Sequence, residues 1–171
     1  MRLATAIANR RLLNLAGLLA CAGMMGFALY VQHVLYYDPC PLCVLQRIAV
    51  ISMGAIFLVA TVHGTDGAFR WVYAALIGLA GAGGAGVAAR HVWLQHLPAD
   101  KVPSCGPGFD YLVDTLPLAD ALKKIFSGSG ECANVDWSLL GLSMPAWVLI
   151  AVVPLALFGI WANARRAPRR W

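Results

Sequence analysis

The sequence predicts an all-α integral membrane protein, a four-transmembrane-helix bundle with one long outer loop. Apolar residues make up 60% of the 171 residues and charged residues only 12%, against about 25% charged in ordinary globular domains. Four stretches lack Asp, Glu, Lys and Arg, namely residues 12–37, 48–65, 71–89 and 137–164. Each is close to the ~20 residues that a helix needs to cross a bilayer. We therefore expect a single domain, residues 1–171, with spans at about 12–36, 43–62, 70–90 and 143–163.

The distribution of charge predicts the orientation of these spans. The net charge of +5 comes from arginines beside the first and last spans and in the middle turn, and not from a nucleic-acid-binding surface. The long loop instead holds three lysines against six acidic residues. The positive-inside rule then places both termini in the cytoplasm, as an even number of spans requires. The loops at about 37–42 and 91–142 face outward, which in a bacterium is the periplasmic side of the inner membrane.

The first span resembles a signal peptide, because arginines precede its apolar core. A cleavable leader or a lipoprotein box ending at Cys21 is the alternative. The apolar run continues well past Cys21, however, and cleavage there would cut the span in half. We expect Cys21 to be a small buried apolar side chain.

The third and fourth spans carry their own signals. Gly78, Ala82 and Gly86 recur every four residues, which favours a face for close helix approach; a groove for a flat ligand is the alternative. In the fourth span, Ser143 is expected to cap the helix and Pro145 suits its first turn.

The long loop is predicted to carry a short amphipathic helix over residues 115–126. Its apolar face contains Leu118, Leu122, Ile125 and Phe126. Such a helix either lies on the bilayer surface or packs on the ends of the spans. The Ser-Gly-Ser-Gly stretch that follows is expected to be flexible and leads to Cys132.

The motif Cys40-Pro41-Leu42-Cys43 stands at the start of the second span. Proline suits the first position of a helix, so both cysteines fall at a helix N-terminus, where the amides and the helix dipole favour thiolate. A CxxC disulfide closes a very small loop and exchanges easily. Arg47 lies four residues beyond Cys43 on the same helix face. It is either a thiolate- and acceptor-binding residue or an arginine that snorkels to the head groups.

The second cysteine pair, Cys105 and Cys132, lies in the outer loop, where disulfides persist. A bond across this loop would stabilise it by roughly 3–4 kcal/mol, so an inert staple is one interpretation. A mobile, partner-facing pair is the other, and the nearby CxxC favours it. The wide spacing of this pair argues against a zinc site, and we expect no metal. Arg90 and His91 are either interface anchors or residues of an acceptor site.

Taken in order, these motifs resemble the disulfide bond formation protein B (DsbB) family over essentially the whole chain. The similar segments are Gln32-His33-Val34 followed by Pro39–Cys43 and Arg47, then Arg90–Gln95, Ser129–Cys132 and Gly141–Trp147. The resemblance implies an inner-membrane enzyme that reoxidises a periplasmic DsbA-like thiol oxidase and passes the electrons to ubiquinone or menaquinone. Cys105 would meet the partner, Cys132 would exchange with Cys40, and Cys43 beside Arg47 would reduce the quinone. Gln46 stands where some members carry an acid, and we assign it no function.

Two other functions stay open on the sequence. One is a non-catalytic membrane scaffold with two structural disulfides. The other is a vitamin-K-type reductase relay, although the sequence has no fused redox domain.

Overall fold

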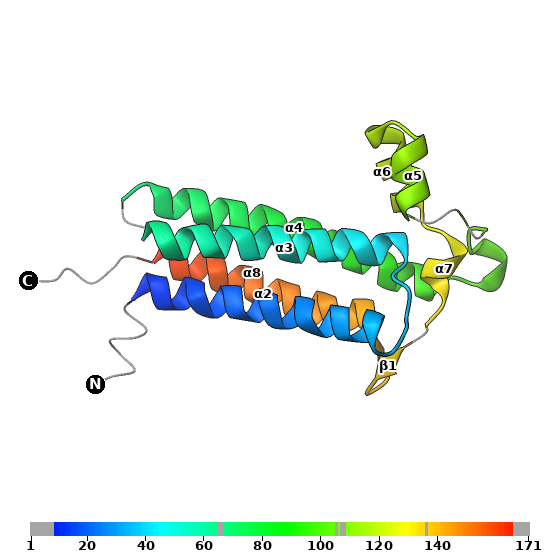
Figure 1. Ribbon diagram of the computed structural model, residues 1–171, viewed down its shortest axis with the longest axis horizontal. Coiled ribbons are helices and arrows are strands. Elements are labelled where there is room, and N and C mark those ends of the chain that lie inside the picture. The colour runs from blue at the N-terminus through cyan, green and yellow to red at the C-terminus, as the bar shows by residue number, and fades with distance from the viewer. Residues whose placement is uncertain (1–8, 65–66, 105, 107–108, 136, 166–171) are drawn as a thin grey trace, which may run out of the picture.

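The computed structural model describes residues 9–64, 67–104, 106, 109–135 and 137–165. Within this part of the chain, four helices are long and apolar enough to cross a membrane: α2 (Arg10–His33), α3 (Pro41–His63), α4 (Phe69–Gln95) and α8 (Met144–Ala164). They run side by side along the long axis of the molecule (Figure 1). Helix α4 packs on α8 and α3, and α2 packs on α3. The predicted all-α, four-helix fold class is confirmed.

Local sequence explains where these helices start and stop. Helix α2 follows Asn9, whose side chain accepts the Arg11 N–H, and α3 follows Cys40 with Pro41 as its first residue. Gly64, in the left-handed conformation at φ 68°, ends α3. Ser143 precedes α8, but its hydroxyl donates to Gln95 Oε1 at 2.6 Å and does not cap the helix. The predicted Ser143 cap is therefore wrong.

Helix α4 is longer than the span expected at residues 70–90 and continues to Gln95. The charge at Arg90 suggested a membrane boundary there. In the structure Arg90 bonds to backbone carbonyls of the outer loop, and the next side chain, His91, is buried at 3% exposure. Because the side chains of Arg90 and His91 both have hydrogen-bond partners within the protein, α4 does not need to end at Arg90.

The close-approach face of α4 differs in part from the predicted Gly78, Ala82, Gly86 face. Gly78 is half-buried, and a Cβ added there would lie 3.2 Å from Ile160 Cδ1 of α8, but Ala82 and Gly86 are exposed. Gly81 and Gly84 are buried instead, and a Cβ added at Gly81 would lie 2.3 Å from the Ala156 Cβ of α8. Spacing alone could not select this face, because the glycine-rich segment offers small residues on several faces. The face that contains Gly81 and Gly84 serves helix packing.

The core between the spans contains the fifth cysteine. Cys21 is 3% exposed and packs with Phe57, Met53 and Ile77 in the main apolar cluster. Its Cβ would lie 3.2 Å from a Cβ added at Gly54. The prediction that Cys21 is a small buried side chain is confirmed.

The outer loop folds over one end of the bundle, where α3 begins and α4 ends (Figure 1). Its elements are η1 (Ala99–Lys101), α5 (Phe109–Thr115), α6 (Leu118–Ser127), α7 (Gly130–Ala133) and the antiparallel pair β1 (Ser138–Leu139) and β2 (Leu142–Ser143).

Helix α6 is the amphipathic helix that the sequence predicts, although it begins only after Pro117. Of its predicted apolar face, only Ile125 is buried; Leu118, Leu122 and Phe126 are exposed. Ile125 packs in a cluster with Leu42 of α3 and Leu94 of α4. Ile125 thus anchors the helix to the ends of the spans, and contact of its exposed apolar residues with the bilayer surface stays a prediction.

Candidate redox site

The CxxC motif forms the first turn of α3. Cys40 occupies the position before the helix, and its sulfur accepts the Cys43 backbone N–H at 3.3 Å. The two sulfurs lie 2.9 Å apart as thiols. The predicted placement of the motif at a helix N-terminus is confirmed. Both side chains are only partly buried, so the dithiol stands at the edge of the bundle.

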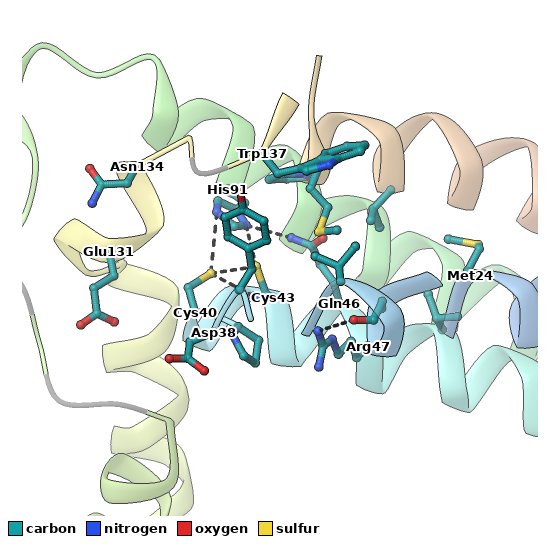
Figure 2. Close-up of a pocket in the computed structure, with 18 of the residues that line it drawn as sticks. Met24, Asp38, Cys40, Cys43, Gln46, Arg47, His91, Glu131, Asn134 and Trp137 are labelled. Carbon is teal, nitrogen blue, oxygen red and sulfur yellow. Dashed lines mark hydrogen bonds between the residues drawn. The ribbon is translucent and has the colours of Figure 1, made fainter. Parts of the chain in front are cut away.

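An imidazole from α4 faces the dithiol. His91 Nε2 lies 3.8 Å from Cys40 Sγ, and His91 Nδ1 lies 4.0 Å from Cys43 Sγ. Gln46, one turn along α3, places its amide nitrogen 3.1 Å from His91 Nδ1. Figure 2 shows these contacts as one connected group. Gln46 and His91 are 5% and 3% exposed, so their mutual bond satisfies two buried polar groups.

The third described thiol of the site comes from the outer loop. Cys132 lies in α7 and is 1% exposed. Its sulfur, the Cys40 sulfur and a ring nitrogen of His91 all lie within 4.8 Å of one another. A hydrogen bond to Cys40 and burial both raise the pKa of the Cys132 thiol, so the docked thiol keeps its proton. Thiols and an imidazole at this spacing can also bind zinc, and the expectation of no metal stays a prediction.

Arg47 joins α3 to α2. Its guanidinium donates to Gln32 Oε1 and, at 3.2 Å, to the Ala28 carbonyl oxygen. These partners lie within the protein, in contrast to the head-group contacts of a snorkelling arginine. Arg47 therefore has a fixed position one turn beyond Cys43.

A cavity of about 120 Å³ opens beside Cys43 and Arg47. The residues labelled in Figure 2 line it from α2, α3 and α4 and from the outer loops, which contribute Asp38, Glu131 and Trp137. Its apolar walls come from α2, α3 and α8, namely Met24, Met25, Val31, Val50, Met144, Pro145 and Val148. Its polar lining includes Gln46 and His91. A cavity of about 150 Å³ holds one benzene molecule, so this space is somewhat smaller than one that encloses a whole aromatic ring.

The chemical nature of the cavity lining bears on whether a quinone can bind there. Apolar side chains surround the space, and a guanidinium, an amide and an imidazole adjoin it. Such groups can polarise the carbonyl oxygens of a quinone while the walls hold its ring. The residues present thus suit this class of acceptor.

The predicted site residues do not all come together. Cys40, Cys43, Arg47, His91 and Cys132 converge, whereas Cys105 lies outside the described residues. Arg90 is absent from the residues that line the cavity. Reasoning from sequence missed Gln46, although its spacing of three residues from Cys43 places it on the same helix face.

The arrangement defines a class of protein. A dithiol at the N-terminus of a membrane helix meets a third thiol and an imidazole, beside an apolar cavity. The class is a multi-pass membrane protein with a thiol–disulfide redox centre.

Comparisons with known proteins identify the family. The model of the family "Disulfide bond formation protein DsbB" matches residues 10–162. The chain is similar to three proteins named Disulfide bond formation protein B. The one from Saccharophagus degradans is 50% identical over 86% of this chain and 89% of its own length. Those from Acinetobacter baumannii and Chromohalobacter salexigens are 48% and 51% identical over 90% and 91% of this chain, and over 91% of their own lengths. The chain belongs to the DsbB family, and its general role is that of a disulfide-forming membrane oxidoreductase.

Proposed function

We propose that the chain is a protein dithiol:quinone oxidoreductase of the bacterial inner membrane. It would reoxidise a periplasmic DsbA-like thiol oxidase and deliver the electrons to ubiquinone or menaquinone. The observation that carries the proposal is the approach of Cys132 to Cys40, beside a cavity lined by Cys43 and Arg47.

The first exchange takes place in the outer loop. A thiolate of the partner attacks Cys105 of a Cys105–Cys132 disulfide, and Cys132 leaves with the electron pair of the broken bond. The partner's second thiol then attacks the mixed disulfide. The partner departs with its disulfide formed, and two electrons and two protons remain on Cys105 and Cys132. The pairing of Cys105 with Cys132 comes from the family resemblance.

The second exchange takes place at the end of the bundle. Cys132 attacks Cys40 of a Cys40–Cys43 disulfide and releases Cys43, and attack by Cys105 on Cys132 restores the loop disulfide. Cys132 must lose its proton to attack, because the thiolate and not the thiol is the nucleophile. His91 reaches the same sulfurs and can accept that proton. This position supports a role for His91 in proton transfer as well as in binding the acceptor.

The direction of electron flow depends on the final acceptor. A DsbA-like oxidase has a potential of about −120 mV, and unstrained protein disulfides are more reducing. A relay of such cysteines alone would run backward. A bound quinone supplies a two-electron acceptor of higher potential. Arg47 and Gln46 would orient the acceptor against Cys43, and the apolar walls would exclude water from it.

The distribution of charge supports the proposed orientation. Arginines lie at the ends of α2 and α8 that are remote from the dithiol, as in Arg10, Arg11 and Arg165. With that end in the cytoplasm, the dithiol and α7 face the periplasm, where a soluble oxidase can reach them.

Turnover of a purified partner dithiol tests the proposal. The protein should oxidise the partner only when quinone is supplied, with quinol formed in equal amount. Cys40→Ser should abolish turnover, since no disulfide can then pass electrons to the cavity. Cys21→Ser is the matched control and should turn over normally, because Cys21 is buried in the apolar core. Undiminished turnover of Cys40→Ser would falsify the relay.

Thiol alkylation in growing cells separates this function from a scaffold with structural disulfides. A scaffold keeps all four paired cysteines oxidised. The relay leaves a fraction of them reduced, and that fraction increases when quinone synthesis is blocked.

A further inference from the structure

Arg90 connects α4 to the far end of α6. Its Nε donates to the Phe126 carbonyl oxygen at 3.2 Å, and its Nη2 donates to the Ser127 carbonyl oxygen at 3.2 Å. Its guanidinium stacks 4.3 Å from the ring centre of Trp93. The last carbonyls of a helix lack partners within the helix and carry partial negative charge. Arg90 thus caps α6 from a neighbouring helix.

The capped end leads directly to the loop cysteine. Gly128 follows α6 at φ 86°, and a Cβ added there would lie 2.5 Å from Leu94 Cδ1. Leu94 is one turn beyond Arg90 on α4. Two residues of α4 therefore hold the short link between α6 and α7, and Cys132 lies four residues past Gly128.

The same link was expected to be flexible because of its glycines and serines. In the structure, two backbone bonds also hold it: Gly128 N–H to Ile125 O at 3.0 Å, and Gly130 N–H to Ser104 O at 3.3 Å. Arg90 supplies the charged contact among these. We infer that Arg90 is a positioning residue, which holds the link so that Cys132 stays at Cys40 and His91.

This inference rests on the proposed relay for its purpose but not for its geometry. Arg90 does not line the cavity, so it should affect transfer between Cys132 and Cys40 and leave acceptor binding unchanged. An arginine that only anchored the protein at the interface would affect neither. Lysine would replace such an anchor fully, but it would replace the two-donor cap only in part, because it is a point charge without the planar fork of arginine.

The rate of disulfide formation between Cys40 and Cys132 provides the test. The parent protein for this test carries Cys21→Ala, Cys43→Ala and Cys105→Ala, so that only the two cysteines of interest remain. Copper phenanthroline supplies the oxidant, and the cross-link is quantified by mass spectrometry after trypsin digestion. We expect Arg90→Ala to slow cross-linking roughly tenfold, the factor that loss of one charge-assisted hydrogen bond can produce. The cross-linking rate of Arg90→Lys should lie between the rates of the parent and of Arg90→Ala.

Arg70→Ala is the matched control. Arg70 stacks 5.5 Å from the ring centre of Trp71 at the opposite end of α4, so its loss removes a similar cation–π contact without touching the link. If Arg90→Ala does not fold, Gly128→Ala pushes the same link away from Leu94 and should also slow cross-linking.

Two outcomes would overturn the inference. One is a cross-linking rate in Arg90→Ala that equals the rate in the parent. Where Gly128→Ala replaces Arg90→Ala, an equal rate in Gly128→Ala has the same meaning. The other is full recovery by lysine. In the protein with all its cysteines, Arg90→Ala should lower kcat and leave the quinone KM unchanged. A protein that shows no quinone-dependent turnover refutes the proposed function but leaves the cross-linking result valid.

Discussion

The bundle buries polar side chains at both of its ends, but in different ways. At the end remote from the dithiol, Asn14 of α2 and Asn163 of α8 are fully buried and bond to each other at 3.1 and 2.9 Å. Their remaining amide hydrogens go to the Arg10 and Gly159 carbonyl oxygens. At the dithiol end, Gln46, Arg47 and His91 adjoin a cavity.

This difference suggests a structural role for the asparagine pair and a functional role for the polar groups at the dithiol end. All four amide hydrogens of the asparagine pair have partners within the chain, so the pair can fix how α2 meets α8 and has no donor left for a ligand. The polar groups at the dithiol end keep surfaces towards the cavity and the sulfurs. Burial of a polar group in a membrane helix therefore suggests function only where its bonding capacity is not used up within the chain.

The largest effect is expected from Arg47→Ala. Removal of the guanidinium should raise the apparent quinone KM roughly ten- to hundredfold, the range of one charged hydrogen bond of about 1.5–3 kcal/mol. Both disulfides should still form, because the hydrogen bonds of Arg47 go to Gln32 and Ala28 and not to Cys40, Cys43 or Cys132. Steady-state kinetics with varied quinone, together with alkylation of free thiols, measures the two effects.

Arg11→Ala is the control from the opposite end. Arg11 is an exposed arginine at the start of α2, and its loss should leave the KM unchanged. An unchanged KM in Arg47→Ala would return Arg47 to a purely structural bridge between α3 and α2 and would weaken the contrast between the two ends.

A smaller effect, on stability, is expected at the contact between α4 and α8, which lies between the two ends of the bundle. Gly81→Ala puts a methyl group where the Ala156 Cβ already lies 2.3 Å away, so α4 and α8 must separate. We expect a loss of unfolding free energy of about 1 kcal/mol or somewhat more. Thermal unfolding in detergent measures it.

Gly83→Ala is the neutral counterpart, because an added Cβ there meets nothing within 4 Å. It should leave stability unchanged or raise it slightly, since alanine favours helix. Equal melting temperatures for both variants would contradict the close approach of α4 and α8 at Gly81.

The sequence was sufficient for the fold class and for part of the site. Charge-free runs near 20 residues predict the spans, and Pro41 predicts that Cys40 and Cys43 begin a helix. It was not sufficient where partners are distant in sequence. Gln46 gains meaning only when α4 brings His91 within 3.1 Å. Arg90 looked like a membrane boundary because its partners, the carbonyls at the end of α6, are 36 and 37 residues away.

The same limit applied to the asparagine pair, which is separated by 149 residues and drew no prediction. Asn14→Ala and Asn163→Ala should have a smaller effect than Arg47→Ala or Gly81→Ala. Hydrogen bonds between membrane helices contribute about 0.6 kcal/mol on average, because the unfolded state within the membrane also finds partners. A double-mutant cycle should therefore give a coupling energy of that size, with quinone-dependent turnover unchanged in all three variants. A loss of turnover without a loss of stability would show that the remote end participates in the reaction, and the division between a structural and a functional end would fail.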